Sequence, residues 1–160
     1  MKKLNSLLLL LLLSSCISTK STIKNIDNTA KRPKMEASFL LLTEYATDSN
    51  YGYNEDYPIN IGFLTENYAE VQVKAYLNAL VQKDGSKIEF KRIDDCCPFP
   101  TKTNSLGVGT LWVYEFYLKN DSKPKNLYIN IYERGEIVCP KGLLINPEVT
   151  NVTEANKQKQ

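Results

Sequence analysis

The chain of 160 residues contains no histidine. This absence excludes catalytic sites that pair a serine or cysteine nucleophile with a histidine base, and every metal site with an imidazole ligand. The sequence also lacks a Cys-x-x-Cys motif, and no carboxylate pair or glycine-rich loop has the spacing of an acid/base or phosphate site. We therefore expect a protein that is not an enzyme and that holds neither cofactor nor metal ion.

The chain also has a small net charge and few long apolar segments. The chain has 20 basic and 18 acidic residues, and two of the basic ones, Lys2 and Lys3, lie in an N-terminal segment that export would remove. The remainder is then formally neutral, which gives no electrostatic support for a nucleic-acid partner. The leucine run of residues 7–13 is shorter than the roughly 20 apolar residues that a membrane-spanning helix needs.

The first residues have the layout of an export signal, with Lys2 and Lys3, the leucine run and then Leu13-Ser14-Ser15-Cys16. The sequence Leu13-Ser14-Ser15-Cys16 resembles the lipobox of bacterial lipoproteins. This resemblance implies cleavage before Cys16, attachment of diacylglycerol to its thiol and acylation of the new amine, for example with palmitate. Two or more acyl chains hold a protein stably on a membrane. Residues 1–15 are thus predicted to be a signal peptide and Cys16 the lipidation site.

The residues after Cys16 indicate which membrane would carry the protein. Ile17 and Ser18 include no acidic retention signal of the kind that follows the cysteine of inner-membrane lipoproteins, and an acidic surface-export tract is also missing. We expect a lipoprotein of the outer membrane that faces the periplasm. Its partners would be membrane lipid, through the acyl anchor, and an envelope protein or glycan.

Composition divides the exported part into three segments. Residues 16–36 are polar and have no apolar period, which predicts a lipidated cysteine followed by a flexible tether. Residues 147–160 are similarly polar and are predicted to form a disordered tail. Residues 37–146 have the size of one compact domain.

The strongest strands are expected at residues 110–118 and 126–132, which are rich in β-branched and aromatic residues and separated by a turn that suits an antiparallel hairpin. Further strands are expected at residues 38–45, 58–62 and 87–93. A helix is predicted over residues 67–82. Its apolar stripe comprises Tyr68, Val71, Ala75, Tyr76, Ala79 and Leu80. The predicted fold class is α+β, with a mostly antiparallel sheet and one main helix packed on it.

Two adjacent cysteines, Cys96 and Cys97, are the most unusual local feature, and Cys139 is the only other cysteine after Cys16. Three thiols permit a vicinal Cys96–Cys97 bridge, a bridge from either one to Cys139, or a thiol kept for a partner. Export favours oxidised cysteines, so a structural disulfide is expected. The alternative is a thiol-dependent redox or metal-binding protein that uses Cys96 and Cys97.

Tyrosines are the second feature, since Tyr51, Tyr53 and Tyr57 share one polar loop. Exposed tyrosines can stack on sugars or contact a protein partner, and this suggests a glycan-binding module as a further alternative. Tyrosines on the predicted strands are more simply explained by cross-strand packing.

Six short stretches between residues 51 and 143 resemble a group of small lipoproteins of uncharacterised function found in Bacteroidota. The stretches are Tyr51-Gly-Tyr-Asn-Glu-Asp-Tyr-Pro-Ile59, Tyr76-Leu-Asn-Ala-Leu80, Asp84-Gly85, Cys96-Cys-Pro-Phe99, Val113-Tyr-Glu115 and Leu127-Tyr-Ile-Asn-Ile-Tyr132. The resemblance implies one module without an established activity. Some members carry the name 2-dehydro-3-deoxyphosphooctonate aldolase, but that enzyme resembles a (β/α)₈ barrel of about 250 residues, for which this domain is too short. We therefore expect a membrane-anchored lipoprotein with a non-catalytic periplasmic binding or envelope-support module.

Overall fold

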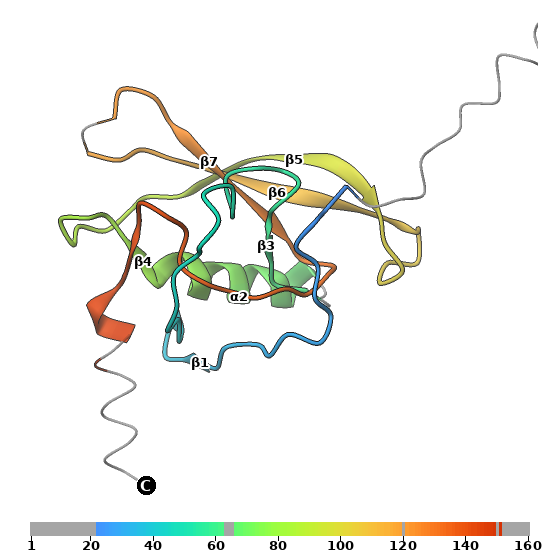
Figure 1. Cartoon of the computed structure of the whole chain (residues 1–160), viewed down its shortest axis with the longest axis horizontal. Helices are drawn as coiled ribbons and strands as arrows, with labels where there is room; N and C mark the ends of the chain where they lie inside the picture. The colour runs from blue at the N-terminus through green and yellow to red at the C-terminus, as the bar shows by residue number, and fades with distance from the viewer. Residues whose placement is uncertain (1–21, 63–65, 120, 150, 152–160) are drawn as a thin grey trace, which may run out of the picture.

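The structure is a computed structural model that describes residues 22–62, 66–119, 121–149 and 151. Its elements are β1 (Met35–Glu36), β2 (Phe39–Leu40), β3 (Ile59–Asn60), α2 (Glu66–Asn78), β4 (Leu80–Val81), β5 (Lys91–Pro100), β6 (Val108–Phe116), β7 (Lys125–Asn130) and β8 (Leu144–Ile145). Figure 1 shows β5, β6 and β7 crossing above α2, with β1 below the helix. The predicted α+β class, a mostly antiparallel sheet with one main helix, is confirmed.

The main sheet has the strand order β3-β7-β6-β5. Its antiparallel pairs are β5 with β6 and β6 with β7, and the second pair confirms the predicted hairpin, with Tyr114 opposite Leu127. At the edge, β3 runs parallel to β7 and places Ile59 opposite Ile129. Strands of this composition fit a pleated surface that is buried on at least one face.

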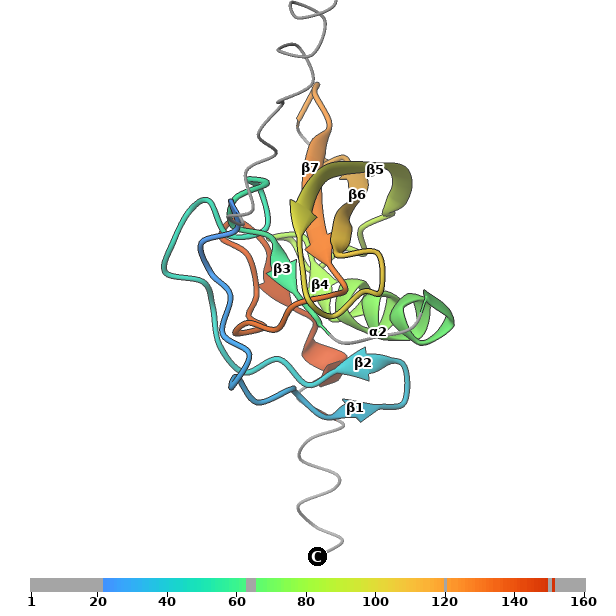
Figure 2. The ribbon, with the colours of Figure 1, turned by 90° about the vertical axis from the view of Figure 1, so that its right-hand side faces the viewer.

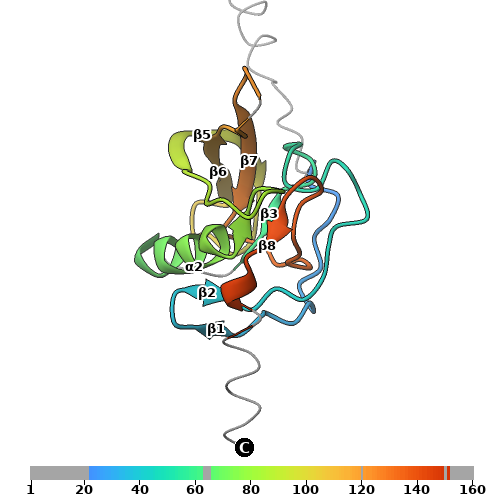
Figure 3. The ribbon, with the colours of Figure 1, turned by 90° about the vertical axis from the view of Figure 1, so that its left-hand side faces the viewer.

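Side chains alternate between the two faces of this sheet along each strand, and each face carries an apolar cluster. Trp112 and Phe116 of β6 and Leu127 of β7 belong to the main core, which also contains the buried face of α2. Leu111 points to the opposite face and packs with Phe99 in a second, smaller cluster. The β1–β2 hairpin lies on the side of α2 away from the sheet (Figure 2). The short strand β8, which pairs with β4, is seen in Figure 3.

The helix ends earlier than predicted, at Asn78, and the predicted stripe is only partly buried. Tyr68 and Val71 of the stripe are 60% and 52% exposed, and Ala69 and Val73 are buried in their place. The other four members of the stripe are buried: Ala75, Tyr76, Ala79 and Leu80. Apolar residues occur around much of this helix, so its sequence alone does not select one face. The partners on the two sides, β2 and the sheet, make that selection.

Two predicted strands also differ. The segment of residues 38–45 forms only the two-residue strand β2, and Tyr45 makes an isolated parallel bridge with Cys139 instead of joining the main sheet. The strand predicted at residues 87–93 begins at Lys91 and continues to Pro100. The adjacent cysteines therefore lie inside this strand.

Residues 22–34, here called the N-terminal strap, lie against the domain, in contrast to the flexible tether that we predicted up to residue 36. Ile23 is buried between Phe99 and Leu111 and covers the second cluster. Polar contacts hold the rest of the strap to the domain. They include Lys24 N to Asp56 O at 2.8 Å, Asn25 Nδ2 to Pro58 O at 2.8 Å, Asp27 N to Arg134 O at 2.8 Å and Asn28 Nδ2 to Glu133 Oε2 at 2.9 Å.

These contacts explain why a polar segment is ordered without an apolar period. The strap satisfies backbone carbonyls and amides of neighbouring loops, which need partners wherever water is excluded. The same holds at the other end, where the tail predicted from residue 147 begins as a helical turn. The side chain of Asn146 accepts a hydrogen bond from Glu148 N at 3.0 Å, and Val149 is buried in the main core. Residues 152–160 of the predicted tail lie outside the described residues.

Candidate functional site

The candidate site is centred on Cys96 and Cys97 in β5. Cys96 pairs with Leu111 of β6, and the register is interrupted between Cys96 and Phe99. Cys97 has a φ of 57°, one of two non-glycine residues with a positive φ among the described residues. In a regular strand, adjacent side chains point to opposite faces. The irregularity at Cys97 turns its side chain back towards that of Cys96.

Cys96 and Cys97 form a disulfide with a Cα–Cα distance of 3.7 Å. Of the pairings that the sequence left open, the structure thus has the vicinal one. Both residues are partly buried and pack against the cluster of Ile23, Phe99 and Leu111. The disulfide therefore has one side on an apolar cluster and one side open to solvent.

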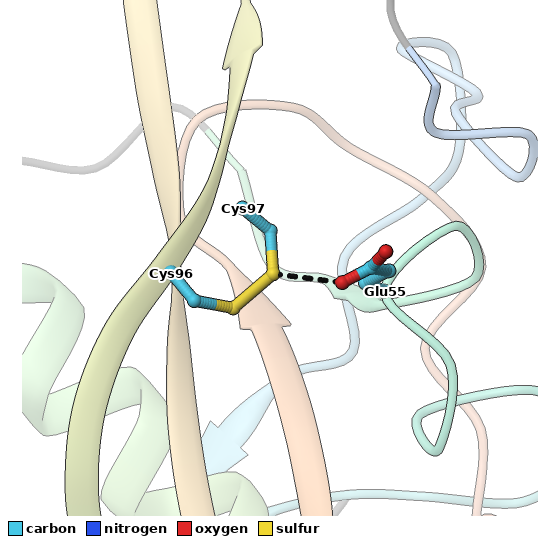
Figure 4. A group of neighbouring side chains, drawn as sticks. All are labelled: Glu55, Cys96 and Cys97. Carbon is cyan, nitrogen blue, oxygen red and sulfur yellow. Dashed lines mark hydrogen bonds between the residues drawn. A yellow bond between two sulfur atoms is a disulfide. The ribbon is translucent and has the colours of Figure 1, made fainter.

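Glu55 is the third residue of the site (Figure 4), and its Oε2 lies 3.0 Å from Sγ of Cys97. A disulfide sulfur carries no proton, so this contact becomes a hydrogen bond only when reduction produces a thiol that donates to the carboxylate. Glu55 comes from the turn of residues 50–57. The turn is held by backbone hydrogen bonds from Gly52 N to Tyr57 O, from Tyr53 N and Asn54 N to Asn50 O, and from Tyr57 N to Asn54 O.

The electrostatics of this arrangement are unfavourable for a reactive thiolate. Reactive cysteines have nearby positive charges or helix N-termini that stabilise the anion. A thiolate on Cys97 would instead face the carboxylate of Glu55, and like charges at this distance repel. After reduction, the site therefore favours neutral thiols, or a bound cation that neutralises the three acidic groups.

Arg92 secures the strand before the cysteines. Its guanidinium carbon lies 3.8 Å from the ring centroid of Trp112, and its Nη2 lies 2.6 Å from Oδ1 of Asp95. The first contact is a cation–π interaction across the β5–β6 pair, and the second fixes the residue that precedes Cys96. Together they bridge the first register shift of β5, between Arg92 and Asp94.

Cys139 takes no part in this site. It is a free thiol that is completely buried in the main core, and burial raises its pKa to about 12. A buried neutral thiol behaves as a small apolar side chain. The structure therefore does not bring Cys139 to the other two cysteines. A bridge to Cys139, which would close a loop of about 42 residues, is not formed.

The three loop tyrosines do not share one exposed surface. Tyr51 is only 7% exposed; its hydroxyl donates to Glu136 O at 3.0 Å and accepts from Val138 N at 3.2 Å. Burial raises the pKa of the Tyr53 hydroxyl to about 12, and this hydroxyl donates to Lys141 O at 2.8 Å. Tyr51 is therefore mostly enclosed in the core, because the turn folds it inward, and a role in ligand contact stays a prediction.

Tyr57 is the loop tyrosine whose surroundings are best suited to a ligand, because it is half-buried at a cavity. It lines a cavity of about 340 Å³ together with Tyr51, while Tyr53 is not part of that lining. Nζ of Lys24 lies 5.4 Å from the centroid of the Tyr57 ring and forms an ion pair with Asp56. The strap thus places an ammonium over one face of the ring.

No protein-family model, curated protein or solved structure matches this chain. The predicted lipidation site, Cys16, lies outside the described residues. Within the described ranges, no helix has the length and apolar character needed to cross a bilayer. Sequence reasoning identified Cys96 and Cys97 but missed Glu55, because nothing in the local pattern of residues 50–57 shows that this turn lies against β5.

Proposed function

We propose that this chain is an exported bacterial lipoprotein whose folded domain acts as a non-catalytic binding or envelope-support module. The observation that carries the proposal is the sequence Leu13-Ser14-Ser15-Cys16 after two lysines and a leucine run. The absence of an acidic residue directly after Cys16 supports the outer membrane and a periplasmic orientation.

The packing of the strap adds an orientation to this proposal. Thr22 follows Cys16 by six residues, which in fully extended form span at most about 22 Å. Because Ile23 is buried against Phe99, a lipid on Cys16 would keep this end of the domain close to the head groups. Figure 1 shows the start of the described chain beside the C-terminal end of β5. The turn between β5 and β6, with Leu106 83% exposed, lies at the same end.

Replacement of the lipidation site tests this proposal. The variant Cys16→Ser should lose acyl labelling and leave the membrane pellet, while Cys139→Ser should keep both, because that thiol is buried in the core. Fractionation and metabolic labelling with a radioactive fatty acid would measure the two effects. Acyl labelling that persists in Cys16→Ser would refute lipidation at this residue. Protease added to intact cells should spare the domain, and its digestion would refute the periplasmic orientation.

A thiol-disulfide function is a second candidate, which the partly exposed position of the vicinal bridge favours, because a reductant can reach it from the solvent side. In this function, a dithiol reductant would transfer two electrons and two protons to the bridge, which yields two thiols and the oxidised reductant. The measurement is the number of alkylated cysteines in protein taken directly from cells. A mixture of bridged and reduced Cys96-Cys97 would support it, and a fully bridged pair under all growth conditions would refute it.

A further inference from the structure

We propose that the reduced Cys96-Cys97 pair, together with Glu55, binds a soft thiophilic metal cation of the class of Cd²⁺ or Cu⁺. The site would be closed to metal in the disulfide form and open after reduction. This inference rests on the second candidate function, reduction of the vicinal bridge, and adds a ligand to it.

The first argument is geometric. One ligand atom from each of Glu55, Cys96 and Cys97 lies within 4.8 Å of the other two. In zinc sites, bonds of about 2.3 Å to sulfur and about 2.1 Å to oxygen place the donors of one ion roughly 3.5–4 Å apart, and a larger cation such as Cd²⁺ tolerates a wider spacing. Opening the bridge frees the two side chains to rotate towards this separation. We therefore expect binding without movement of the sheet.

The second argument concerns the backbone of β5. Adjacent cysteines on a regular strand could not bind one ion, since their side chains point to opposite faces. The irregular register after Cys96 and the φ of 57° at Cys97 bring both sulfurs to one side. The contacts that hold the backbone before the cysteines, those of Arg92 and the pairing with β6, do not involve the sulfur atoms.

The third argument is the charge and softness of the donors. Two thiolates beside a carboxylate repel one another unless a cation neutralises them. Thiolates prefer soft cations, and the site contains no imidazole to complete a zinc set. Two sulfurs and one oxygen leave a four-coordinate ion with an open position, which is suited to exchange of the metal and not to a permanent structural role.

The fourth argument is the dependence on the redox state. In the bridge, neither sulfur can become a thiolate, and only thiolates bind metal. Reduction by a dithiol consumes two electrons and two protons and gives two thiols. The cation then displaces the two thiol protons as it binds, so affinity should rise with pH. Cys139 contributes nothing, because it is buried in the main core.

The test is a Cd²⁺ titration of the full-length protein in both redox states. The protein is reduced with a phosphine, and the reductant is then removed under anaerobic conditions. Alkylation and mass spectrometry of a separate portion count the thiols released from Cys96 and Cys97. Sulfur-to-cadmium charge-transfer absorption and calorimetry then measure binding. We expect one Cd²⁺ per reduced chain at this site and none in the disulfide form.

Matched variants assign the ligands. Cys96→Ser should abolish the charge-transfer band at this site, and Cys139→Ser should leave it unchanged. Glu55→Gln should weaken binding at least about tenfold, because even residues that only orient a ligand contribute 10–100-fold to metal affinity. Circular dichroism of each variant verifies that it is folded.

The outcomes separate the two proposals. A bridge that resists reduction would overturn the second candidate function and, with it, the metal site. Two counted thiols without Cd²⁺ binding would overturn the metal site alone, and so would unchanged binding in Cys96→Ser. Equal affinity in Glu55→Gln would remove the carboxylate from the ligand set and refute the three-residue site.

Discussion

Reduction of the Cys96–Cys97 bridge should change the stability of the domain very little. In the chain-entropy model, a disulfide stabilises by restricting the unfolded chain, and the effect grows with the length of the closed loop. For two adjacent residues, this gives about 1 kcal/mol at 25 °C, whereas a bridge from Cys96 to Cys139 would give about 4 kcal/mol. The vicinal pairing in the structure therefore predicts the smaller value.

The left-handed φ of 57° at Cys97 costs a residue with a Cβ roughly 1–2 kcal/mol. The irregular register of β5 against β6 holds this conformation, so we expect the same cost before and after reduction and no contribution to the difference. We expect a change of about 1 kcal/mol or less in the free energy of unfolding, and a shift of no more than about 5 °C in the melting temperature for a domain of this size.

Thermal and urea unfolding with and without a phosphine reductant, followed by circular dichroism, would measure this change. Cys139→Ser is the control and should respond to the reductant in the same way. Alkylation of the denatured lipidated protein should label one cysteine before reduction and three afterwards. A loss of 3 kcal/mol or more on reduction would refute the reasoning, since only a bridge that closes a long loop accounts for that loss.

Two further predictions concern the core and the orientation on the membrane. Tyr76→Phe should lower the free energy of unfolding, measured with urea, by about 1–3 kcal/mol. The buried hydroxyl of Tyr76 donates to Val138 O at 3.0 Å, and its loss leaves that carbonyl without this donor. An unchanged urea midpoint would contradict this role. In the lipidated protein, the fluorescence of Leu106→Trp should be blue-shifted by contact with lipid and quenched by brominated lipids. The matched variant Val71→Trp on α2 should show neither effect. Equal quenching of the two variants would contradict the proposed orientation.

The parts of the fold that the sequence predicted depend on local patterns. The hairpin of β6 and β7 follows from two runs of β-branched and aromatic residues around one turn, and α2 follows from a segment with helical spacing. The fold class then follows from the number and order of these elements. The adjacent cysteines were identified in the same way, as a local feature in a chain with an export signal.

The sequence did not predict the contacts between distant segments. The buried face of α2 depends on what packs against it, so Val73 is buried and Val71 is exposed although both are apolar. The order of the strap depends on hydrogen bonds to loops more than 30 residues away, such as that of Asn25 to Pro58. Such pairs leave no periodic signal in either segment, because each partner is an ordinary polar group in its own neighbourhood.

The candidate site combines both kinds of information. The sequence by itself determined that two thiols stand next to each other, and it left their pairing open. Only the tertiary structure decided that Cys139 is enclosed in the core, that the irregular register of β5 joins Cys96 to Cys97, and that Glu55 lies 3.0 Å from the second sulfur. Burial and strand pairing set these distances, and both arise from the packing of the whole domain.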